Sequence, residues 1–547
     1  MINEYLQPIF TNALTKLGIT PDEPIVFEAP KIAEHGDAST NIAMKLAKTM
    51  RDNPRNIAEK IIANLEIDSH FIAAVESAGA GFINIRFANA FFQNAIAEFA
   101  QIGESFGKSN YGKGKSVNVE YVSVNPTGLL HLGHGRNACI GDTIANLYAA
   151  IGYDVTREYY FNNAGNQMNI LAKSIYTRYR QQLDEPDYPF PEDGYHGDYV
   201  REIAAGLVSE VGSSLIAGTP EDLTKCRKFG EEWCFAKIKQ TLERMNIHQD
   251  LYFNEDTLYS DGKIEQVIAD FRKLGLAYEK ESALWLAFSQ LGLKDDRVIV
   301  KSSGEPTYRL PDIAYHREKF NRGYDLLVDV FGADHIATVP DVMAGLRALG
   351  YEPDKVKVLI HQFVTLTENG QQVKMSKRTG KNYTLDDLLD EVGEDVVRFF
   401  LIMRGISTHM EFDLGLAREQ SDKNPVFYLQ YAHARICSVF ENAKEKGIYV
   451  SDKPDYSLLN HDTEINLIKS LNTFPDAVLA SAMKFEPQIL AENLRQLATD
   501  FHFFYHECRI LQAEEELMQA RLGLIRVVRF ALYNGLSILG VKAPERM

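Results

Sequence analysis

The segment 116–151, which reads SVNVEYVSVNPTGLLHLGHGRNACIGDTIANLYAAI, constrains the fold of this chain more than any other stretch. Its first residues alternate apolar and polar side chains, which predicts a half-buried β-strand. Turn-forming residues at 125–128 then interrupt the run, and from about Gly133 apolar residues recur at helical spacing as far as Ile151. With a further short strand predicted at 155–160, the segment begins a right-handed β-α-β unit of a parallel sheet.

Two histidines, His131 and His134, stand at the junction between the predicted loop and helix. They are three residues apart, so both side chains are expected on one face of the first helical turn. Gly133 lies between them, where a ligand can approach the backbone. Because the free N–H groups and the dipole of a helix N-terminus attract anions, this junction is predicted to hold a polyphosphate.

The same junction carries a recognisable motif. NPTGLLHLGH resembles the HIGH signature of class I aminoacyl-tRNA synthetases, with leucine in place of isoleucine. Far downstream, VKMSKRTG at 373–380 is similar to the mobile KMSKS loop of the same class, with Arg378 in place of the final serine. An HxGH motif alone also occurs in other nucleotidyl transferases, whereas the two motifs in this order point to one class. The resemblance implies catalytic roles for His131, His134, Lys374 and Lys377.

Activation of an amino acid by ATP gives the lysine loop a physical task. The reaction develops negative charge on the α-phosphate and the departing pyrophosphate, and fixed cations aimed at those oxygens lower the barrier. Lys374 and Lys377 are point charges on flexible stems, and the glycines that flank the loop allow it to close on a substrate. The residues expected to contact ATP around these two motifs are Gly133, Met375 and Ser376.

A second part of the nucleotide site is predicted at the end of a later strand. Residues 326–331 form an apolar run typical of a buried parallel strand, and Gly332, Asp334 and His335 follow it. A glycine and an acid after such a strand suit the ribose and the adenine edge of ATP. Further strands are expected at 251–255, 297–301 and 356–364.

The amino acid must be recognised at the carboxyl edge of the sheet, where several acids are predicted to gather. Tyr308 and Asp312 are four residues apart, one helical turn, so they could face one ligand together. A guanidinium presents five donors in a rigid fork, and two or three acids in a deep pocket therefore favour a cationic substrate. FEAPKIAEHGDASTNIAMKLAK and YYFNNAGNQMN resemble segments of arginyl-tRNA synthetases, and this resemblance assigns Glu120 and Asn125 to the ammonium end of arginine. It assigns the guanidinium to Glu255, Tyr308 and Asp312. A glutamine contact that is usual in that family near Asp334 has no clear counterpart here.

The resemblance to arginyl-tRNA synthetases covers essentially the whole chain. FEAPKIAEHGDASTNIAMKLAK is similar to their N-terminal additional domain, which touches the tRNA elbow, and YYFNNAGNQMN is similar to the bacterial catalytic domain. NPVFYLQYAHARI and the terminal LGVKAPERM are similar to the helical anticodon-binding domain, although the sequence lacks a clear DALR tetrad.

The expected fold class is α/β, with a Rossmann-like parallel-sheet catalytic domain between an N-terminal α/β domain and a C-terminal all-helical anticodon-binding domain. The expected boundaries are 1–110 for the N-terminal tRNA-binding domain, 111–383 for the catalytic domain with a helical insertion near 184–245, 384–423 for connecting helices, and 424–547 for the anticodon-binding domain.

The composition is that of a large globular enzyme and argues against several other classes. Of the 547 residues 45% are hydrophobic and 24% charged, as is ordinary for globular proteins, and no apolar run approaches the length of a membrane span. The five cysteines include no CxxC pair, which argues against a disulfide framework or a zinc knuckle and fits a reducing cytoplasm. Because the net charge is −17, contacts with RNA must come from local basic stripes.

The resemblance implies an arginine–tRNA ligase, in which L-arginine and ATP with Mg²⁺ give arginyl-adenylate before transfer to tRNA(Arg). It also implies that tRNA must be bound before activation. A cytoplasmic monomer is expected, without membrane contact or protein-held metal. Two alternatives stay open, a class I synthetase for glutamate and a tRNA-binding paralogue with an inactive site. The arginyl-like terminal domains and the acidic pocket argue against the first, and the two intact signatures argue against the second.

Overall fold

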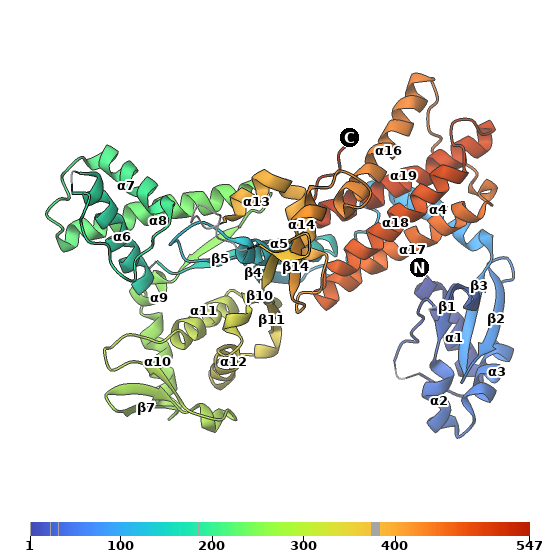
Figure 1. Ribbon diagram of the computed structural model, residues 1–547. Helices are drawn as coiled ribbons and strands as arrows, with labels where there is room; N and C mark the ends of the chain where they lie inside the picture. The colour runs from blue at the N-terminus through green and yellow to red at the C-terminus, as the bar shows by residue number, and fades with distance from the viewer. Residues whose placement is uncertain (1, 22, 31, 164, 184, 374–382) are drawn as a thin grey trace.

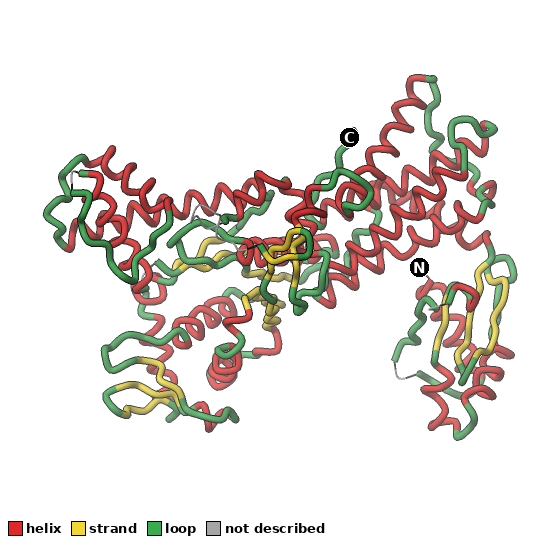
Figure 2. Tube along the Cα trace, in the orientation of Figure 1, coloured by secondary structure: helices red, strands yellow, loops and turns green. Residues whose placement is uncertain are grey.

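The computed structural model describes residues 2–21, 23–30, 32–163, 165–183, 185–373 and 383–547. The molecule is elongated, with a central sheet between a helical insertion at one end and a bundle of long helices toward the other (Figure 1). Figure 2 shows strands in three regions: the centre, a small outlying sheet and the N-terminal module. In the described part of the chain, no helix combines the length and the apolar character needed to cross a membrane.

The central sheet has five parallel strands in the order β11-β10-β4-β5-β6. Their bounds are β4 Ser116–Glu120, β5 Asp154–Phe161, β6 Leu251–Asn254, β10 Leu326–Gly332 and β11 Val356–His361. The first strand, β4, lies in the middle, and the chain continues to β5 on one side and later returns to β10 on the other. The carboxyl ends of β4 and β10 therefore border the switch point of the sheet, where open α/β sheets bind their ligands.

The helix α5 (Leu132–Ala150) follows β4 as predicted and is buried on nearly all its faces. It packs not only on β4, β5 and β10 but also on helices from the C-terminal half of the chain. A surface helix would have one apolar stripe, whereas α5 also buries Arg136, Asn137 and Asp142. The helix that carries the histidine motif is thus the central element of the molecule.

Two insertions interrupt the sheet. The first contains α6 (Asn166–Gln182), α7 (Asp198–Val211) and α8 (Pro220–Arg244) and has its own hydrophobic core. The second begins with α9 (Asp256–Ser260) and α10 (Lys263–Lys273) and adds an antiparallel sheet of β7 (Ala277–Lys280), β8 (Ala283–Leu286) and β9 (Arg297–Val300). The strand predicted at 297–301 is present, but it belongs to this outlying sheet because it pairs with β8. The chain then returns to β10 through α11 (Arg309–Asn321) and reaches β11 through α12 (Val339–Ala348).

After β11 the chain leaves the central sheet. The single strand predicted at 356–364 ends at His361, and β12 (Val364–Glu368) pairs instead with β13 (Gln371–Gln372) and β14 (Met410–Asp413). The connecting helices are α13 (Leu385–Val392), α14 (Glu394–Ile402) and α15 (Leu414–Arg418). α13 begins with a capping box, in which Thr384 and Asp387 exchange side-chain and backbone hydrogen bonds.

The helical bundle contains helices from both the N-terminal and the C-terminal part of the chain. The N-terminal module contains α1 (Ile2–Lys16), β1 (Ala38–Thr40), α2 (Ile42–Met50), α3 (Pro54–Asn64), β2 (Ile72–Ala78) and β3 (Phe82–Phe87). The bundle contains α16 (Pro425–Glu445), α17 (Asp462–Lys484), α18 (Gln488–Glu507) and α19 (Glu515–Ile538). The helix α4 (Asn89–Ile102), which lies inside the expected domain 1–110, packs on α17 and α19 and so belongs physically to the bundle.

Candidate active site at the carboxyl edge of the sheet

His131 and His134 form the N-terminal cap of α5. The Nδ1 atom of His131 accepts hydrogen bonds from the backbone N–H of Gly133 (3.1 Å) and of His134 (3.4 Å). In return the backbone N–H of His131 donates to Nδ1 of His134 at 3.3 Å. The two rings stack with their centroids 3.4 Å apart, which confirms that both lie on one face of the first turn. This reciprocal arrangement satisfies donors that a helix start otherwise leaves free.

Both imidazoles are held in the neutral form. Burial lowers the pKa of His131, and burial together with the neighbouring imidazoles lowers the pKa of His134 to about 3. Because each Nδ1 atom accepts a hydrogen bond, the proton of each neutral ring must reside on Nε2. The pair therefore offers two Nε2–H donors beside a helix N-terminus, which is a suitable surface for phosphate oxygens.

A strained turn joins β4 to this helix start. Val122 and Ser123 have φ values of 68° and 45°, a conformation that is unusual for any residue with a side chain and rare for valine. The side-chain oxygen of Asn137, on α5, accepts a hydrogen bond from Val122 N–H at 2.6 Å. The hydroxyl of Tyr159 bonds both backbone groups of Val124. Such strain costs on the order of 1–3 kcal/mol per residue and persists only where neighbours hold it.

Some of the residues predicted to bind ATP lie at this edge of the sheet. Gly332 is the last residue of β10, and a Cβ atom there would lie 2.6 Å from Oδ1 of Asp334. Asp334 and His335 form a short turn after the strand and are both well exposed, with the His335 ring stacked on Phe331. A further imidazole, that of His361 at the end of β11, lies 3.4 Å from the Asn137 amide. Lys374, Met375, Ser376 and Lys377 lie outside the described residues.

Glu255 and Asp312, both predicted to bind the guanidinium, have carboxyl groups in different surroundings, since Glu255 is buried and Asp312 is half-buried. Glu255, at the start of α9, accepts hydrogen bonds from the hydroxyls of Tyr160 (2.5 Å) and Tyr259 (3.3 Å). Burial raises its pKa. Asp312, on α11, has its pKa raised to about 7 by burial and by the nearby carboxylates of Glu255 and Glu120. In the described part of the chain, the Asp312 carboxylate has no hydrogen bond or ion pair.

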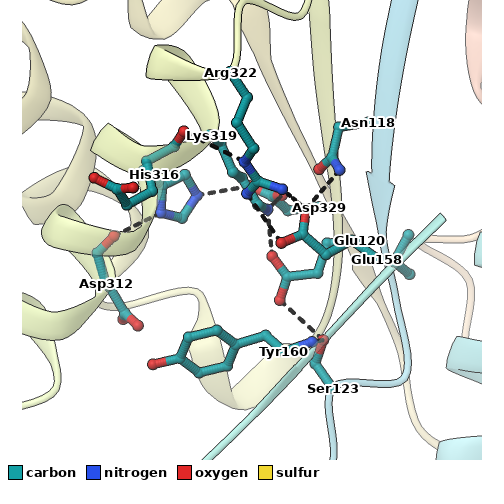
Figure 3. Close-up of polar contacts among 12 residues, drawn as sticks. Asn118, Glu120, Ser123, Glu158, Tyr160, Asp312, His316, Lys319, Arg322 and Asp329 are labelled. Carbon is teal, nitrogen blue, oxygen red and sulfur yellow. Dashed lines mark hydrogen bonds and ion pairs between the residues drawn. The ribbon is translucent and has the colours of Figure 1, made fainter. Parts of the chain in front are cut away.

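Glu120 belongs to a buried network of charges (Figure 3). One oxygen of its carboxylate pairs with Lys319, and the other accepts a hydrogen bond from the Ser123 hydroxyl at 3.0 Å. Lys319 also pairs with Asp329 at 2.6 Å and is completely buried. Burial opposes the charge of this lysine, but Asp329 and Glu120 outweigh it and raise its pKa.

The network continues on both sides of Lys319. His316 bonds Asp329 through Nε2 at 2.8 Å and the Asp312 carbonyl through Nδ1 at 2.7 Å. Arg322 clamps both oxygens of Glu158, at 2.9 and 3.0 Å. Glu120 therefore has a structural partner for each carboxylate oxygen. A role toward a substrate ammonium is a proposal that rests on the closeness of Glu120 to Asp312.

The other two residues predicted to bind arginine are Asn125 and Tyr308. The Asn125 side chain bonds Gln167 and the backbone of Asn162, which ties the loop after β4 to the loop before α6. Tyr308 directly precedes α11 and its side chain is 77% exposed, whereas Asp312 is half-buried one turn later. The structure therefore puts these two side chains on the same helix start without a contact between them.

Sequence reasoning missed the buried partners, although the sequence contained a signal for them. Asp329 is an acid inside the apolar run LLVDVFG, and a buried acid requires a partner. Asp312, His316 and Lys319 follow one another at spacings of four and three residues, which places them on one helical face. Tyr160 is a residue of the strand predicted at 155–160, but its hydroxyl contact with Glu255 depends on the tertiary fold.

A parallel sheet whose switch point carries an HxGH helix start is the catalytic fold of class I aminoacyl-tRNA synthetases. The family description "tRNA synthetases class I (R), catalytic domain" matches residues 100–401. "Arginyl tRNA synthetase N terminal domain" matches residues 4–87, and "DALR anticodon binding domain" matches residues 429–547. The chain belongs to the arginyl-tRNA synthetase family.

Relatives and solved structures agree with this assignment. The chain is 47% identical to an arginine–tRNA ligase of Salinibacter ruber over the full length of both proteins. It is 48% identical to an arginine–tRNA ligase of Desulfotalea psychrophila, with 95% of this chain and 94% of the relative covered. The structure of Thermus thermophilus arginyl-tRNA synthetase superposes with a TM-score of 0.79 over all of both chains at 22% identity, which shows a shared fold.

Proposed function

We propose that this chain ligates L-arginine to tRNA(Arg) through an arginyl-adenylate, with release of pyrophosphate and then AMP. ATP would lie across the carboxyl ends of β4 and β10, with its phosphates at the α5 N-terminus. The Nε2–H groups of His131 and His134 would donate to phosphate oxygens, and Lys374 and Lys377 would supply the positive charge. Donors of this kind act on charge that develops in the transition state.

The unpaired carboxylate of Asp312 is the observation that supports arginine as the substrate. Removing water from a carboxylate that has no partner is costly, and two further acids, Glu255 and Glu120, lie close enough to raise the pKa of Asp312. Figure 3 shows Asp312 and Tyr160 on the same side of the buried network. A guanidinium that enters this space supplies the missing charge and donors in a planar fork. We assign Asp312 and Glu255 to the guanidinium, with Tyr308 as a residue that closes over it.

The ammonium end of arginine would lie nearer to β4, beside Asn125 and above Glu120. We propose that Mg²⁺ enters the site together with ATP. The described residues contain no group of three or more His, Cys, Asp or Glu side chains that could hold a metal. Mg²⁺ commonly binds through substrate phosphates and water, so the phosphates would bring the ion into the site. We further propose a cytoplasmic monomer that needs bound tRNA before it activates arginine.

ATP–pyrophosphate exchange tests the substrate and the need for tRNA in one series. The full-length protein is assayed with arginine, lysine or glutamate, each with and without tRNA(Arg). We expect exchange with arginine only, near background without tRNA and raised 10²-fold or more with it, since a coupling of about 3 kcal/mol corresponds to this factor. Exchange with glutamate would reassign the substrate, and no exchange with any amino acid would favour an inactive tRNA-binding paralogue. Strong exchange without tRNA would contradict the tRNA requirement alone.

A further inference from the structure

Arg398, on α14, is buried where four parts of the chain meet. Its Nη2 atom pairs with Oδ2 of Asp142 on α5 at 2.5 Å. Nη1 donates to the Met245 carbonyl just after α8 at 2.5 Å, and Nε and Nη2 reach the Leu539 carbonyl just after α19 at 3.4 Å. One guanidinium therefore joins the catalytic helix, the end of the first insertion, the connecting helices and the end of the helical bundle.

The segment after α19, residues 539–544, is fixed between two of these parts, and we name it the C-terminal strap. The backbone N–H of Lys542 donates to Oδ1 of Asp395, one turn before Arg398 on α14. The Gln430 amide, on α16, donates both to Oδ2 of Asp395 at 2.8 Å and to the Lys542 carbonyl at 2.9 Å. The strap thus connects the bundle helix α16 with the helix that carries Arg398.

The catalytic helix also touches the end of α19 directly. Asn146, one turn after Asp142, donates from its amide to the Ile538 carbonyl at 3.2 Å and to Oδ2 of Asp142 at 3.2 Å. On the far side, the Tyr121 hydroxyl lies 3.4 Å from Oδ1 of Asp142. Asp142 is therefore held by Arg398 of α14, by Tyr121, which follows β4, and by Asn146 of its own helix, whose amide also reaches the bundle.

Gly540 is the position of the strap that lies directly against Arg398. Its φ of +70° is left-handed, as is common for a glycine after a helix. A Cβ atom there would lie 1.8 Å from Nη2 and 2.1 Å from Cζ of Arg398. No side chain fits this position unless the guanidinium or the strap moves. Gly447, just after α16, has a φ of +72° but nothing within 4 Å of its Cβ position.

We propose that Arg398 is a positioning residue, through which the C-terminal strap sets the placement of α5 and of the histidines at its N-terminus. A change in how the helical bundle lies, such as binding of tRNA would cause, moves the strap. The displaced strap moves Arg398 and, through their ion pair, Asp142. Because α5 is one continuous helix, this displacement reaches the histidines at its N-terminus. Asp142 lies eight residues after His134, about 12 Å along the helix axis at 1.5 Å per residue. The inference rests on the proposed function and extends it to a route between bundle and site.

Gly540→Ala and Gly447→Ala form a matched pair for the test. Both place a Cβ atom on left-handed backbone in the helical part of the chain, but only the first meets Arg398. Each full-length protein is measured for its melting temperature, its Kd for tRNA(Arg), and its kcat and KM values in exchange with saturating tRNA. For Gly540→Ala we expect kcat to fall about tenfold or more, within the usual range of coupling between sites. The Kd for tRNA and the KM for ATP should stay within about twofold. Gly447→Ala should match the parent protein in kcat, KM and Kd, with a melting temperature lowered by alanine on left-handed backbone.

A double-mutant cycle assigns the effect to Arg398. Arg398→Lys keeps a charge for Asp142 but removes the planar group that Gly540→Ala would meet, so the two changes should be non-additive. Additive effects, equal kcat in Gly540→Ala and Gly447→Ala, or weaker tRNA binding with unchanged kcat would each overturn the inference. If Gly540→Ala does not fold, Asn146→Ala is measured in its place. An unchanged kcat of Asn146→Ala would likewise overturn the inference. Failure of the parent protein to exchange with arginine would instead overturn the proposed function.

Discussion

The Asp312 carboxyl group shows how a single residue can make substrate binding depend on pH. Burial and the neighbouring carboxylates disfavour the ionised form and raise its pKa to about 7. A guanidinium binds the ionised form, so binding of arginine should release a proton. The two histidines of the α5 cap do not interfere near neutral pH, since the pKa values of both are lowered.

We therefore expect kcat/KM for arginine to fall as the pH drops below 7, by up to about tenfold per pH unit, because one proton must leave before the substrate binds. Asp312→Asn should remove this dependence and raise the KM for arginine about 10²-fold or more, as when one partner of a buried ion pair is lost. The measurement is the pH profile of exchange from 5.5 to 8, with the profile for ATP as control. A flat arginine profile in the parent protein would place Asp312 outside the pocket.

Lys319 illustrates a different dependence, that of the fold on a buried cation. Lys319→Met would leave Glu120 and Asp329 buried without their lysine, a change that typically costs about 3–5 kcal/mol. The two carboxyl groups would then have raised pKa values, so the folded state would bind protons more readily than the unfolded state and lose stability as the pH rises. Thermal unfolding at pH 5.5 and pH 8 should show a larger loss at pH 8.

Lys301→Met is the control for this change. Lys301 pairs with Glu305 at 3.2 Å on the surface, where both side chains are exposed, and such pairs contribute about 0–1 kcal/mol. An equal effect of the two substitutions would contradict a structural role for the buried network.

At the scale of single elements, the start of α5 combines a helix cap with the proposed catalytic donors. His131 caps the helix through Nδ1, while Nε2–H is the donor that the proposed reaction requires. Asparagine is a good capping residue, whereas alanine is not, and loss of a cap costs about 0.5–2 kcal/mol. The two roles can therefore be separated by the choice of substitution.

We expect His131→Asn to keep the melting temperature of the parent protein and His131→Ala to lower it. Exchange should fall about 10²–10³-fold in both variants, because each loses a donor to the transition state. Melting curves and exchange assays on the two variants make the comparison. If His131→Asn retained normal exchange, the imidazole would serve as a cap only.

In the molecule as a whole, the boundary between the N-terminal module and the helical bundle does not follow the order of the chain. α4 packs in the bundle, and the Asn534 amide donates to the carbonyls of Glu104 (2.8 Å) and Phe106 (2.9 Å). The Phe106 ring lies 5.7 Å from that of Phe474. The module before α4 is connected more lightly, for example by the ion pair of Asp37 with Lys469.

Two truncations should therefore behave differently. A chain that begins at Ala88 should remain soluble and fold, with weaker binding of tRNA, because only the lightly connected module is lost. A chain that begins at Tyr111 should aggregate, because removal of α4 exposes the apolar surface of α17 and α19. Gel filtration and circular dichroism distinguish the outcomes. Equal folding of both chains would show that α4 is dispensable to the bundle.

Features that depend on neighbours along the chain could be predicted from the amino-acid sequence alone. Periodicity and short spacings, which local backbone geometry enforces, predicted the strand, turn and helix of 116–151 and the two class I motifs. The fold class followed from these motifs and from the resemblance of the terminal domains. The assignment of Asp312 and Glu255 to the guanidinium came from the resemblance to arginyl-tRNA synthetases, and their environments came from the structure.

Which distant residues became partners depended on how the whole chain packs. The Lys319 network joins β4 and β10 through α11, Arg398 joins four elements, β9 pairs outside the central sheet, and α4 leaves its own domain for the bundle. None of these contacts has a period or a fixed spacing in the sequence. A charged side chain in an apolar stretch announces that a partner is needed, but the identity of the partner depends on how the packed elements exclude water around it.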